Sequence, residues 1–339
     1  MNIPSCVSYH LEGKKVWVAG HRGMVGSAVV RRLASEGCEI VTASRTELDL
    51  RRQSDVEAWM DRVRPDAIIL AAAKVGGILA NDTHPATFLY DNVMIETNII
   101  HASRQSGTEK LLLLGSSCIY PRLAAQPIRE NALLSGPLES TNQWYAVAKI
   151  AGIKMCQAYR RQFGADFISA MPPNLYGPND NFDPLSSHVL PALLLKAHRA
   201  KLQRLIEIEL WGTGKPRREF MYVDDLADAL VHLLQTYSGE EPVNVGVGYD
   251  VTISELAEMI MRVVGVDAQI RFNPSIPDGT PRKLLDSSRL FSMGWCPKTS
   301  LEDGLRRLYA WYLQTETQNS CSDPLPGALL HPCAAGPVG

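Results

Sequence analysis

The sequence predicts an α/β protein built on a doubly wound parallel sheet, followed by a smaller C-terminal lobe that is discontinuous in the chain. Apolar runs of strand length alternate with helical patterns at βαβ spacing from residue 15 to residue 170. A glycine-rich segment follows the first strand and opens the first helix. After residue 171 the alternation breaks, and proline, glycine and asparagine become frequent.

The first part of the chain is expected to alternate strictly between strands and helices. The third apolar run, residues 67–73, contains no polar residue, as is typical of a parallel strand that is covered on both faces. In order, we expect strands at 15–19, 38–43, 67–73, 110–114 and 166–170, and helices at 24–36, 55–64, 87–105 and 143–163. This order is typical of a Rossmann-type domain, here residues 14–171.

The second part is expected to form mainly a separate lobe, residues 172–314, with helices at 223–234 and 253–264. A short apolar run at 243–246 is placed to return to the main sheet, so parts of 216–247 are expected to rejoin the first domain. Residues 1–13 and 315–339 are predicted to be flexible tails, the second because it is rich in Ser, Pro, Gly and Ala.

Bulk composition excludes several classes of function. A formal net charge of -2 over 339 residues gives no reason to expect a nucleic-acid or anionic-membrane partner. No apolar run approaches the roughly 20 residues that span a bilayer, and no secretory signal is visible. The 7 cysteines are scattered without a Cys-x-x-Cys pair, which argues against a disulfide framework or a metal site and favours a reduced, cytoplasmic compartment.

The glycine-rich segment is the first candidate binding site. The first glycine allows a tight turn, the second lets backbone approach a pyrophosphate, and the third lets helix and strand pack closely. The following helix N-terminus favours the anionic phosphates. The expected cofactor contacts here are Gly20, His21, Arg22, Gly23, Met24, Val25 and Gly26.

The choice of dinucleotide depends on the end of the second strand. An NAD site usually has an acidic residue there that binds the ribose 2′-hydroxyl, but the strand end at 42–45 has no carboxylate, and the next one is Glu47. Arg22 in the turn and Arg45 at the strand end have the geometry to bind a 2′-phosphate instead. The sequence therefore predicts NADP(H).

A tyrosine and a lysine share one face of the helix at 143–163. Tyr145 and Lys149 are four residues apart, and a nearby ammonium is expected to lower the pKa of the phenol. That would make the tyrosine a usable proton donor to a carbonyl oxygen under reduction. Tyr-x-x-x-Lys also occurs by chance, but after the fourth strand of a dinucleotide fold it resembles the extended short-chain dehydrogenase/reductase superfamily.

The end of the fourth strand carries further reactive side chains. Ser116 and Cys118 fall on the same side of an extended chain at the edge where such folds bind ligands. A serine there can bind the substrate carbonyl beside Tyr145, as in that superfamily, although the sequence does not decide between Ser116 and Ser117. A thiol can accept a proton made acidic by an adjacent ketone. The alternative is an inert buried cysteine.

Six segments together resemble one family, the GDP-L-fucose synthases, which are GDP-4-keto-6-deoxy-D-mannose 3,5-epimerase/4-reductases. They are residues 20–27, 72–78, 115–121, 145–152, 174–178 and 278–286. The resemblance implies epimerisation at carbons 3 and 5 of a GDP-sugar, followed by NADPH-dependent reduction of the ketone at carbon 4. It also implies a homodimer in which the two long helices of each subunit form a four-helix interface.

The resemblance also assigns roles to individual residues. It implies that Cys118 is the base and His188 the acid of the epimerisation, with Ser116, Tyr145 and Lys149 serving the reduction. Further cofactor contacts are implied at Asp49, Leu50, Lys149, Pro172, Asn174, Leu175 and His188, and substrate contacts at Lys196, Trp211, Arg218 and Asp278. Two positions depart from the family pattern: Lys196 replaces a frequent arginine, and Pro173 replaces a threonine.

Two other functions compete with this one. Another nucleotide-sugar 4-epimerase or dehydratase would recycle its cofactor, but the Asp-Glu pair of such dehydratases is absent from the 115–121 loop and Cys118 is present. A non-catalytic dinucleotide-sensing protein on the same fold is the alternative from a different class. The combination of Ser116, Tyr145 and Lys149 argues against it.

Overall fold

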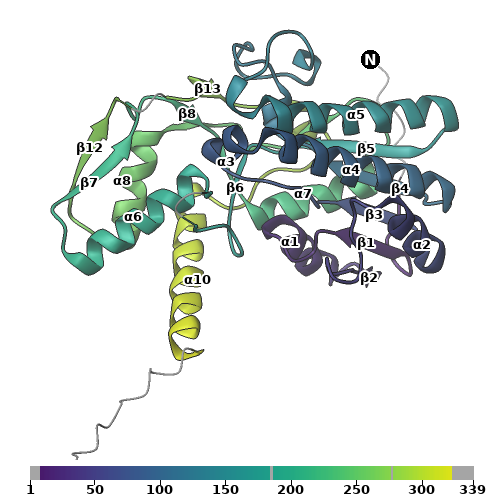
Figure 1. The fold of residues 1–339 in the computed structure, drawn as a ribbon, viewed down its shortest axis with the longest axis horizontal. Coiled ribbons are helices and arrows are strands. Elements are labelled where there is room, and N and C mark those ends of the chain that lie inside the picture. Colours follow the sequence, from purple (N-terminus) through teal and green to yellow (C-terminus); the bar gives the residue numbers. More distant parts are fainter. Residues whose placement is uncertain (1–7, 184–185, 276–277, 323–339) are drawn as a thin grey trace, which may run out of the picture.

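A parallel sheet forms the centre of the molecule (Figure 1). The computed structural model describes residues 8–183, 186–275 and 278–322. Six strands pair in the order β10-β5-β4-β3-β1-β2, and every pairing is parallel. The strands are β1 (Lys15–Ala19), β2 (Glu39–Val41), β3 (Ala67–Leu70), β4 (Lys110–Leu114), β5 (Asp166–Met171) and β10 (Val243–Asn244). The chain moves to opposite sides of β1 for β2 and β3, so the topological switch point lies between β1 and β3.

Helices cover both faces of this sheet. The alternation of β1 sends Val16 and Val18 to one face, where they pack with α1 (Met24–Leu33) and α7 (Val223–Thr236). Trp17 and Ala19 point to the other face, against α2 (Gln53–Val63), α4 (Pro85–Gln105) and α5 (Gln143–Phe163). A short α3 (Ile78–Thr83) follows β3, and a 3-10 turn η1 (Ser117–Ile119) follows β4. These connections leave the sheet at its carboxyl edge.

A smaller lobe with its own core stands at one end of the sheet (Figure 1). Its three main helices are α6 (Val189–Gln203), α8 (Ile253–Val264) and α10 (Leu301–Ser322). They pack with the pair β7 (Glu207–Trp211) and β12 (Gln269–Asn273). The remaining elements are β6 (Asn174–Tyr176), β8 (Arg217–Arg218), β9 (Phe220–Tyr222), β11 (Val251–Thr252), β13 (Arg282–Lys283), α9 (Ser288–Ser292), η2 (Glu130–Ala132) and η3 (Ser140–Asn142).

The predicted doubly wound parallel sheet is confirmed, and β10 pairs with β5, which returns the chain to the main sheet. Several element ends differ from the prediction. Strand β3 ends at Leu70, because residues 71–73 leave the ladder after the bond from Ala71 N to the Ala19 carbonyl at 3.0 Å. Helix α4 begins at Pro85, a residue whose fixed φ suits a first helical position. The domain boundaries at 14–171 and 172–314 stay a prediction.

Residues 8–13 and 315–322 of the predicted flexible tails lie in the described structure, and their flexibility stays a prediction. Tyr9 N donates to the Gln235 carbonyl at 2.7 Å, and Leu11 is buried in the core, because this short segment still carries apolar side chains. At the other end, α10 continues to Ser322, past the predicted limit at residue 314. Residues 1–7 and 323–339 lie outside the described residues. No helix in the described part is both long and apolar enough to cross a membrane.

Candidate active site

The glycine turn after β1 has the shape of a phosphate cradle. Gly20 has a φ of +91°, and a Cβ there would lie 2.7 Å from Ala72 Cα on the neighbouring strand's exit. A Cβ on Gly26 would collide with the Gly20 carbonyl. Gly23 caps α1 without a side-chain hydrogen bond, and no acidic residue occupies the first helical turn. The first amides of α1 therefore face a site that fits an anionic dinucleotide.

Two arginines border this turn. Arg22 and Arg45 are both exposed, and neither forms a hydrogen bond or an ion pair with another described residue. Glu47 folds back to accept a hydrogen bond from Ser44 N at 2.7 Å. The Ser44 hydrogen bonds, with smaller contributions from the charges of Arg22 and His21, lower the pKa of Glu47. Glu47, the first carboxylate after the end of β2, thus interacts electrostatically with Arg22.

Removing both arginines is expected to weaken NADPH binding selectively. A hydrogen bond to a charged group contributes about 1.5–3 kcal/mol, so the Arg22→Ala, Arg45→Ala double variant should lose roughly 100-fold in NADPH affinity. NADH, which lacks the 2′-phosphate, should lose little. Fluorescence titration with each cofactor measures both losses, and Arg62→Ala, an exposed arginine on α2, is the control. Equal losses for the two cofactors would contradict the assignment.

The segment at 49–51 is held by its own side chains and by helix α4. Asp49 is bound by Arg51 at 2.8 and 2.9 Å, which lowers the pKa of Asp49 to about 2. The Leu50 carbonyl accepts from Asn98 Nδ2 of α4 at 3.0 Å. Both predicted cofactor residues, Asp49 and Leu50, therefore sit on a rigid edge after β2. The Asp49 carboxylate is already occupied by Arg51, so the backbone of this segment is the more available part.

Ser116 is the serine that meets the tyrosine. Its hydroxyl accepts from Cys118 N at 3.2 Å and shares a hydrogen bond with the phenol of Tyr145. Ser117 is instead buried at 3% exposure, and its amide donates to the Pro172 carbonyl at 3.0 Å. The geometry favours Ser116 over Ser117 beside the phenol. It also explains how Pro172, a predicted cofactor residue, anchors the end of β4.

The expectation that Lys149 lowers the pKa of Tyr145 is wrong for this structure. Burial raises the pKa of the phenol, and the neighbouring Cys118 and Glu96 raise it further, against the Ser116 hydrogen bond. Lys149 Nζ lies 5.8 Å from the ring centroid and donates to the Leu114 carbonyl at 2.9 Å. It also pairs with Glu96 Oε1 at 2.7 Å. The spacing of Tyr145 and Lys149 is as expected, but the Glu96 carboxylate neutralises the charge of Lys149.

Cys118 stands in partly exposed surroundings that offer several donors. Asn142 Nδ2, just before α5, lies 3.3 Å from the sulfur, and Lys283 Nζ of β13 lies 3.9 Å from it. Arg218 interacts electrostatically with the same sulfur, although burial is the larger effect and lowers the pKa of Arg218. A thiolate at Cys118 would have an amide and an ammonium group to stabilise it. This is not the environment of an inert core cysteine.

His188 is held at the start of α6 by close backbone packing. Gly77 N donates to the Ser186 carbonyl at 2.9 Å, and a Cβ on Gly77 would lie 2.7 Å from the Ser187 carbonyl oxygen. The imidazole is accessible to solvent but crowded by protein, and desolvation lowers its pKa. No hydrogen bond within the described residues joins His188 to Cys118, so its role as the opposing acid stays a prediction.

The predicted substrate residues form a connected group. Lys196 Nζ lies 5.2 Å from the Trp211 ring centroid, and that ring is 59% exposed, unlike a core tryptophan. Thr213, two residues on, donates to Asp278 from its amide and its hydroxyl at 2.9 and 2.6 Å. Asp278 also interacts electrostatically with Arg218, which faces Cys118. The Trp211 ring and the Arg218 guanidinium are therefore linked through Thr213 and Asp278, and Arg218 interacts with the Cys118 thiol.

The last two predicted cofactor residues lie on the strand after β5. Asn174 donates to the Glu219 carbonyl from its amide at 3.2 Å and from Nδ2 at 3.3 Å, in the pairing of β6 with β9. Leu175 packs partly buried against the core that β1 and α1 share. Their contact with a cofactor stays a prediction.

Three residues near the reactive groups were missed from sequence: Asn142, Lys283 and Glu96. Lys283 lies inside the recognisable 278–286 segment, so that segment was the available signal. Asn142 directly precedes the helix that carries Tyr145. Glu96 stood out only as an acid in a largely apolar helical stretch.

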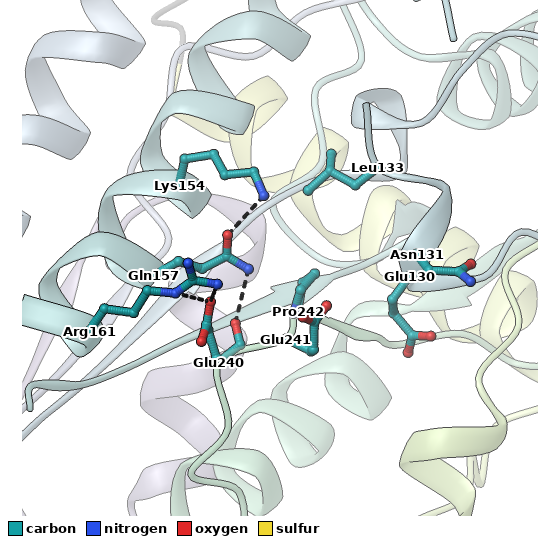
Figure 2. A pocket seen from close by; sticks show the side chains of 9 residues that line it. All are labelled: Glu130, Asn131, Leu133, Lys154, Gln157, Arg161, Glu240, Glu241 and Pro242. Atoms are coloured by element: carbon teal, nitrogen blue, oxygen red, sulfur yellow. Dashed lines mark hydrogen bonds and ion pairs between the residues drawn. The ribbon is translucent and has the colours of Figure 1, made fainter. Parts of the chain in front are cut away.

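A surface pocket of about 160 Å³ lies away from all of these groups (Figure 2). It is lined by Glu130, Asn131, Leu133, Lys154, Gln157, Arg161, Glu240, Glu241 and Pro242. Several of its polar groups bind one another, as in the contacts of Lys154 with Gln157 at 2.9 Å and of Arg161 with Glu240 at 2.5 Å. The predicted catalytic residues Ser116 and Cys118 follow β4 instead, at the carboxyl edge of the sheet.

Known proteins are similar to this chain over most of its length. A model of the NAD dependent epimerase/dehydratase family matches residues 16–246. A GDP-L-fucose synthase of Sinorhizobium fredii is 60% identical over 311 residues, which cover 92% of this chain and 99% of that protein. The chain belongs to the GDP-L-fucose synthase family. The GDP-L-fucose synthase of Escherichia coli is 51% identical over 313 residues, covering 89% of this chain and 98% of that one.

A solved structure with a different named activity agrees in fold. A GDP-mannoheptose C4 reductase from Campylobacter jejuni, with NADP bound, is 37% identical, with a TM-score of 0.81 over 89% of this chain and 98% of that one. The two chains therefore share their fold over most of their length.

Proposed function

We propose that this chain converts GDP-4-keto-6-deoxy-D-mannose to GDP-L-fucose by epimerisation at carbons 3 and 5 and reduction at carbon 4. The cofactor is NADP(H). The observation that carries the proposal is the presence of a thiol and a phenol in one site, where Cys118 and Tyr145 interact electrostatically and Ser116 bonds to both residues. A simple reductase needs the phenol alone, so the thiol is what epimerisation requires.

The residues divide the chemistry between them. The ketone at carbon 4 makes the protons on carbons 3 and 5 acidic, and Cys118 removes each proton to leave an enolate. His188 returns a proton to the opposite face, which inverts the carbon. The thiol then loses its proton to solvent and the imidazole regains one before the second carbon reacts. Bound NADPH supplies the hydride for carbon 4. Ser116 orients the ketone oxygen and Tyr145 protonates it, a role that suits a phenol whose pKa burial keeps high.

The connected group at Lys196, Trp211, Arg218 and Asp278 is proposed to bind the GDP part of the substrate. The exposed Trp211 ring offers a face for a guanine base, and Lys196 above it adds a positive charge. Arg218 has the fork geometry that binds a diphosphate, and its burial strengthens that contact. With the base at Trp211 and the diphosphate at Arg218, the sugar would lie at Cys118.

One assay separates the candidate functions. The protein is incubated with GDP-4-keto-6-deoxy-D-mannose and NADPH, NADPH oxidation is followed by absorbance, and the sugar is identified by NMR. We expect one NADPH consumed for each GDP-L-fucose formed. A 4-epimerase or dehydratase would show no net consumption, and a non-catalytic binding protein would leave the sugar unchanged. Reduction to a product that keeps the original configuration at carbons 3 and 5 would refute the epimerase half.

We also propose a homodimer formed through α4 and α5. These helices pack on each other on one face of the sheet and expose apolar side chains, namely Tyr90 at 61%, Trp144 at 43% and Val147 at 43%. Burying these side chains, here called the α4/α5 patch, against a second copy of the chain would be favourable. A cytoplasmic location is proposed with it, because a free thiol at Cys118 stays reduced there.

A charge on this patch is expected to separate the subunits. Val147→Glu would place a carboxylate in an apolar interface, so the mass from light scattering should fall from that of a dimer to that of a monomer. Leu202→Glu, which charges an equally apolar and 70% exposed position on α6, should leave the mass unchanged. A monomeric wild type, or a Val147→Glu protein that remains dimeric, would contradict this interface.

A further inference from the structure

The lysine of the reductase site has a buried partner on the neighbouring helix. Lys149 of α5 and Glu96 of α4 are 2% and 1% exposed, and their Nζ and Oε1 atoms lie 2.7 Å apart. The same ammonium donates to the Leu114 carbonyl at the end of β4. Two contacts from two elements therefore fix where the lysine's charge lies, beneath the ring of Tyr145.

Helix α5 has a glycine at the position that contacts this carboxylate. Gly152 of α5 faces Glu96, and a Cβ there would collide with Oε2 and lie 3.0 Å from Leu113 Cδ2. Oε2 has no hydrogen-bond partner among the described residues, although it is fully buried. A carboxylate buried at this cost is not explained by helix packing, because an apolar side chain would fill the slot more favourably.

We propose that Glu96 is a positioning residue for the reductase step, which fixes and neutralises the Lys149 ammonium beneath the Tyr145 ring and keeps the phenol in its proton-donating form. Reduction needs Tyr145 as an acid, whereas oxidation of the alcohol would need it as a base. Glu96 therefore favours the reductive direction. This role presupposes the reductase function proposed above.

The charged surroundings support this role. Burial raises the pKa of Glu96, and the ammonium of Lys149 opposes that rise. Glu96 acts electrostatically on Tyr145 and on Cys156, both of α5, and Tyr145 also faces Cys118 of η1. Among the described residues, Lys149 is the charged group that shifts the pKa of Glu96. Removing its charge therefore changes the balance at Tyr145 directly.

The test compares Glu96→Gln with the wild type in two reactions. A glutamine side chain has the same shape as glutamate, but it carries no negative charge to neutralise the Lys149 ammonium. In reduction, activity falls as pH rises through the pKa of the phenol, which must carry its proton. Removing the carboxylate should shift this alkaline limb to lower pH by about one unit. Deuterium exchange at carbons 3 and 5, which uses Cys118, should stay within a few-fold of the wild type.

A matched pair elsewhere in the fold provides the control. The buried Lys110 pairs with the partly exposed Asp166 at 2.6 Å, at the amino ends of β4 and β5 and thus at the opposite edge of the sheet. Asp166→Asn should lower thermal stability but leave the alkaline limb in place. A Glu96→Gln protein with an unmoved limb, or one that is folded but loses exchange and reduction alike, would overturn the proposal.

A second variant decides the case if Glu96→Gln does not fold. Glu96→Asp keeps the charge but shortens the side chain, so its reduction rate should fall several-fold while its exchange persists. A wild-type reduction rate in Glu96→Asp would then overturn the proposal. If the wild type itself does not oxidise NADPH, the reductase function fails, and the two failures are thereby distinguished.

Discussion

Replacing Cys118 by serine is expected to lower deuterium incorporation from solvent at carbons 3 and 5 by about 10²–10⁴-fold, the usual contribution of a general base. A serine hydroxyl is far less acidic than a thiol, so it does not supply an anionic base near neutral pH. The substitution keeps the contact distances to Asn142 and Lys283 similar, because only sulfur is exchanged for oxygen. NMR of the substrate in D₂O without NADPH measures the exchange.

Two controls accompany this variant. Cys296→Ser alters an exposed cysteine outside the site and should exchange at the wild-type rate. NADPH affinity should be unchanged in Cys118→Ser, because no cofactor contact is assigned to the sulfur. Exchange that persists at the wild-type rate would show that another group is the base and would remove the central reason for assigning epimerisation to this site.

Replacing Tyr145 by phenylalanine is expected to lower the reduction rate by about 10²–10⁴-fold while exchange continues. The phenol is the group bonded to Ser116, and burial holds its pKa above the ordinary value, so the phenol stays protonated through neutral pH. Single-turnover oxidation of NADPH measures the step. The remaining activity should also lose the alkaline limb that the phenol causes.

Tyr159→Phe serves as the matched control for this variant. Tyr159 lies on the same helix, α5, but its hydroxyl bonds to His101 Nδ1 at 2.7 Å instead of facing the site. It should reduce the substrate at the wild-type rate. If Tyr145→Phe also reduced at that rate, the proton would have to come from another donor, and Ser116 would be the next candidate.

Local patterns predicted the sheet and the glycine turn well, because both are determined by neighbours in sequence. The helix at 143–163 was predicted to the residue, since Gly164 ends it with a φ of +68°. The end of β3 and the contacts of residues 8–13 were missed, because they depend on distant parts of the chain. Tyr9, for example, is held by Gln235. The continuation of α10 to Ser322 was missed because the composition of that segment favoured a tail.

The candidate site was predicted unevenly for the same reason. Tyr145 and Lys149 are four residues apart on one helix, so their proximity follows from spacing alone. The pairing of Lys149 with Glu96 joins two helices and depends on the absence of a side chain at Gly152, which no local pattern reveals. The expected effect of Lys149 on Tyr145 was therefore wrong, because burial and a carboxylate on another helix outweigh it.

The position of isotopes in the product tests the proposed function most directly. The protein is given GDP-4-keto-6-deoxy-D-mannose and unlabelled NADPH in D₂O, and the product is analysed by NMR. We expect GDP-L-fucose with deuterium at carbons 3 and 5, where Cys118 and His188 exchange protons with solvent, and with protium at carbon 4, where the hydride arrives. A product with protium at carbons 3 and 5, or deuterium at carbon 4, would contradict the account.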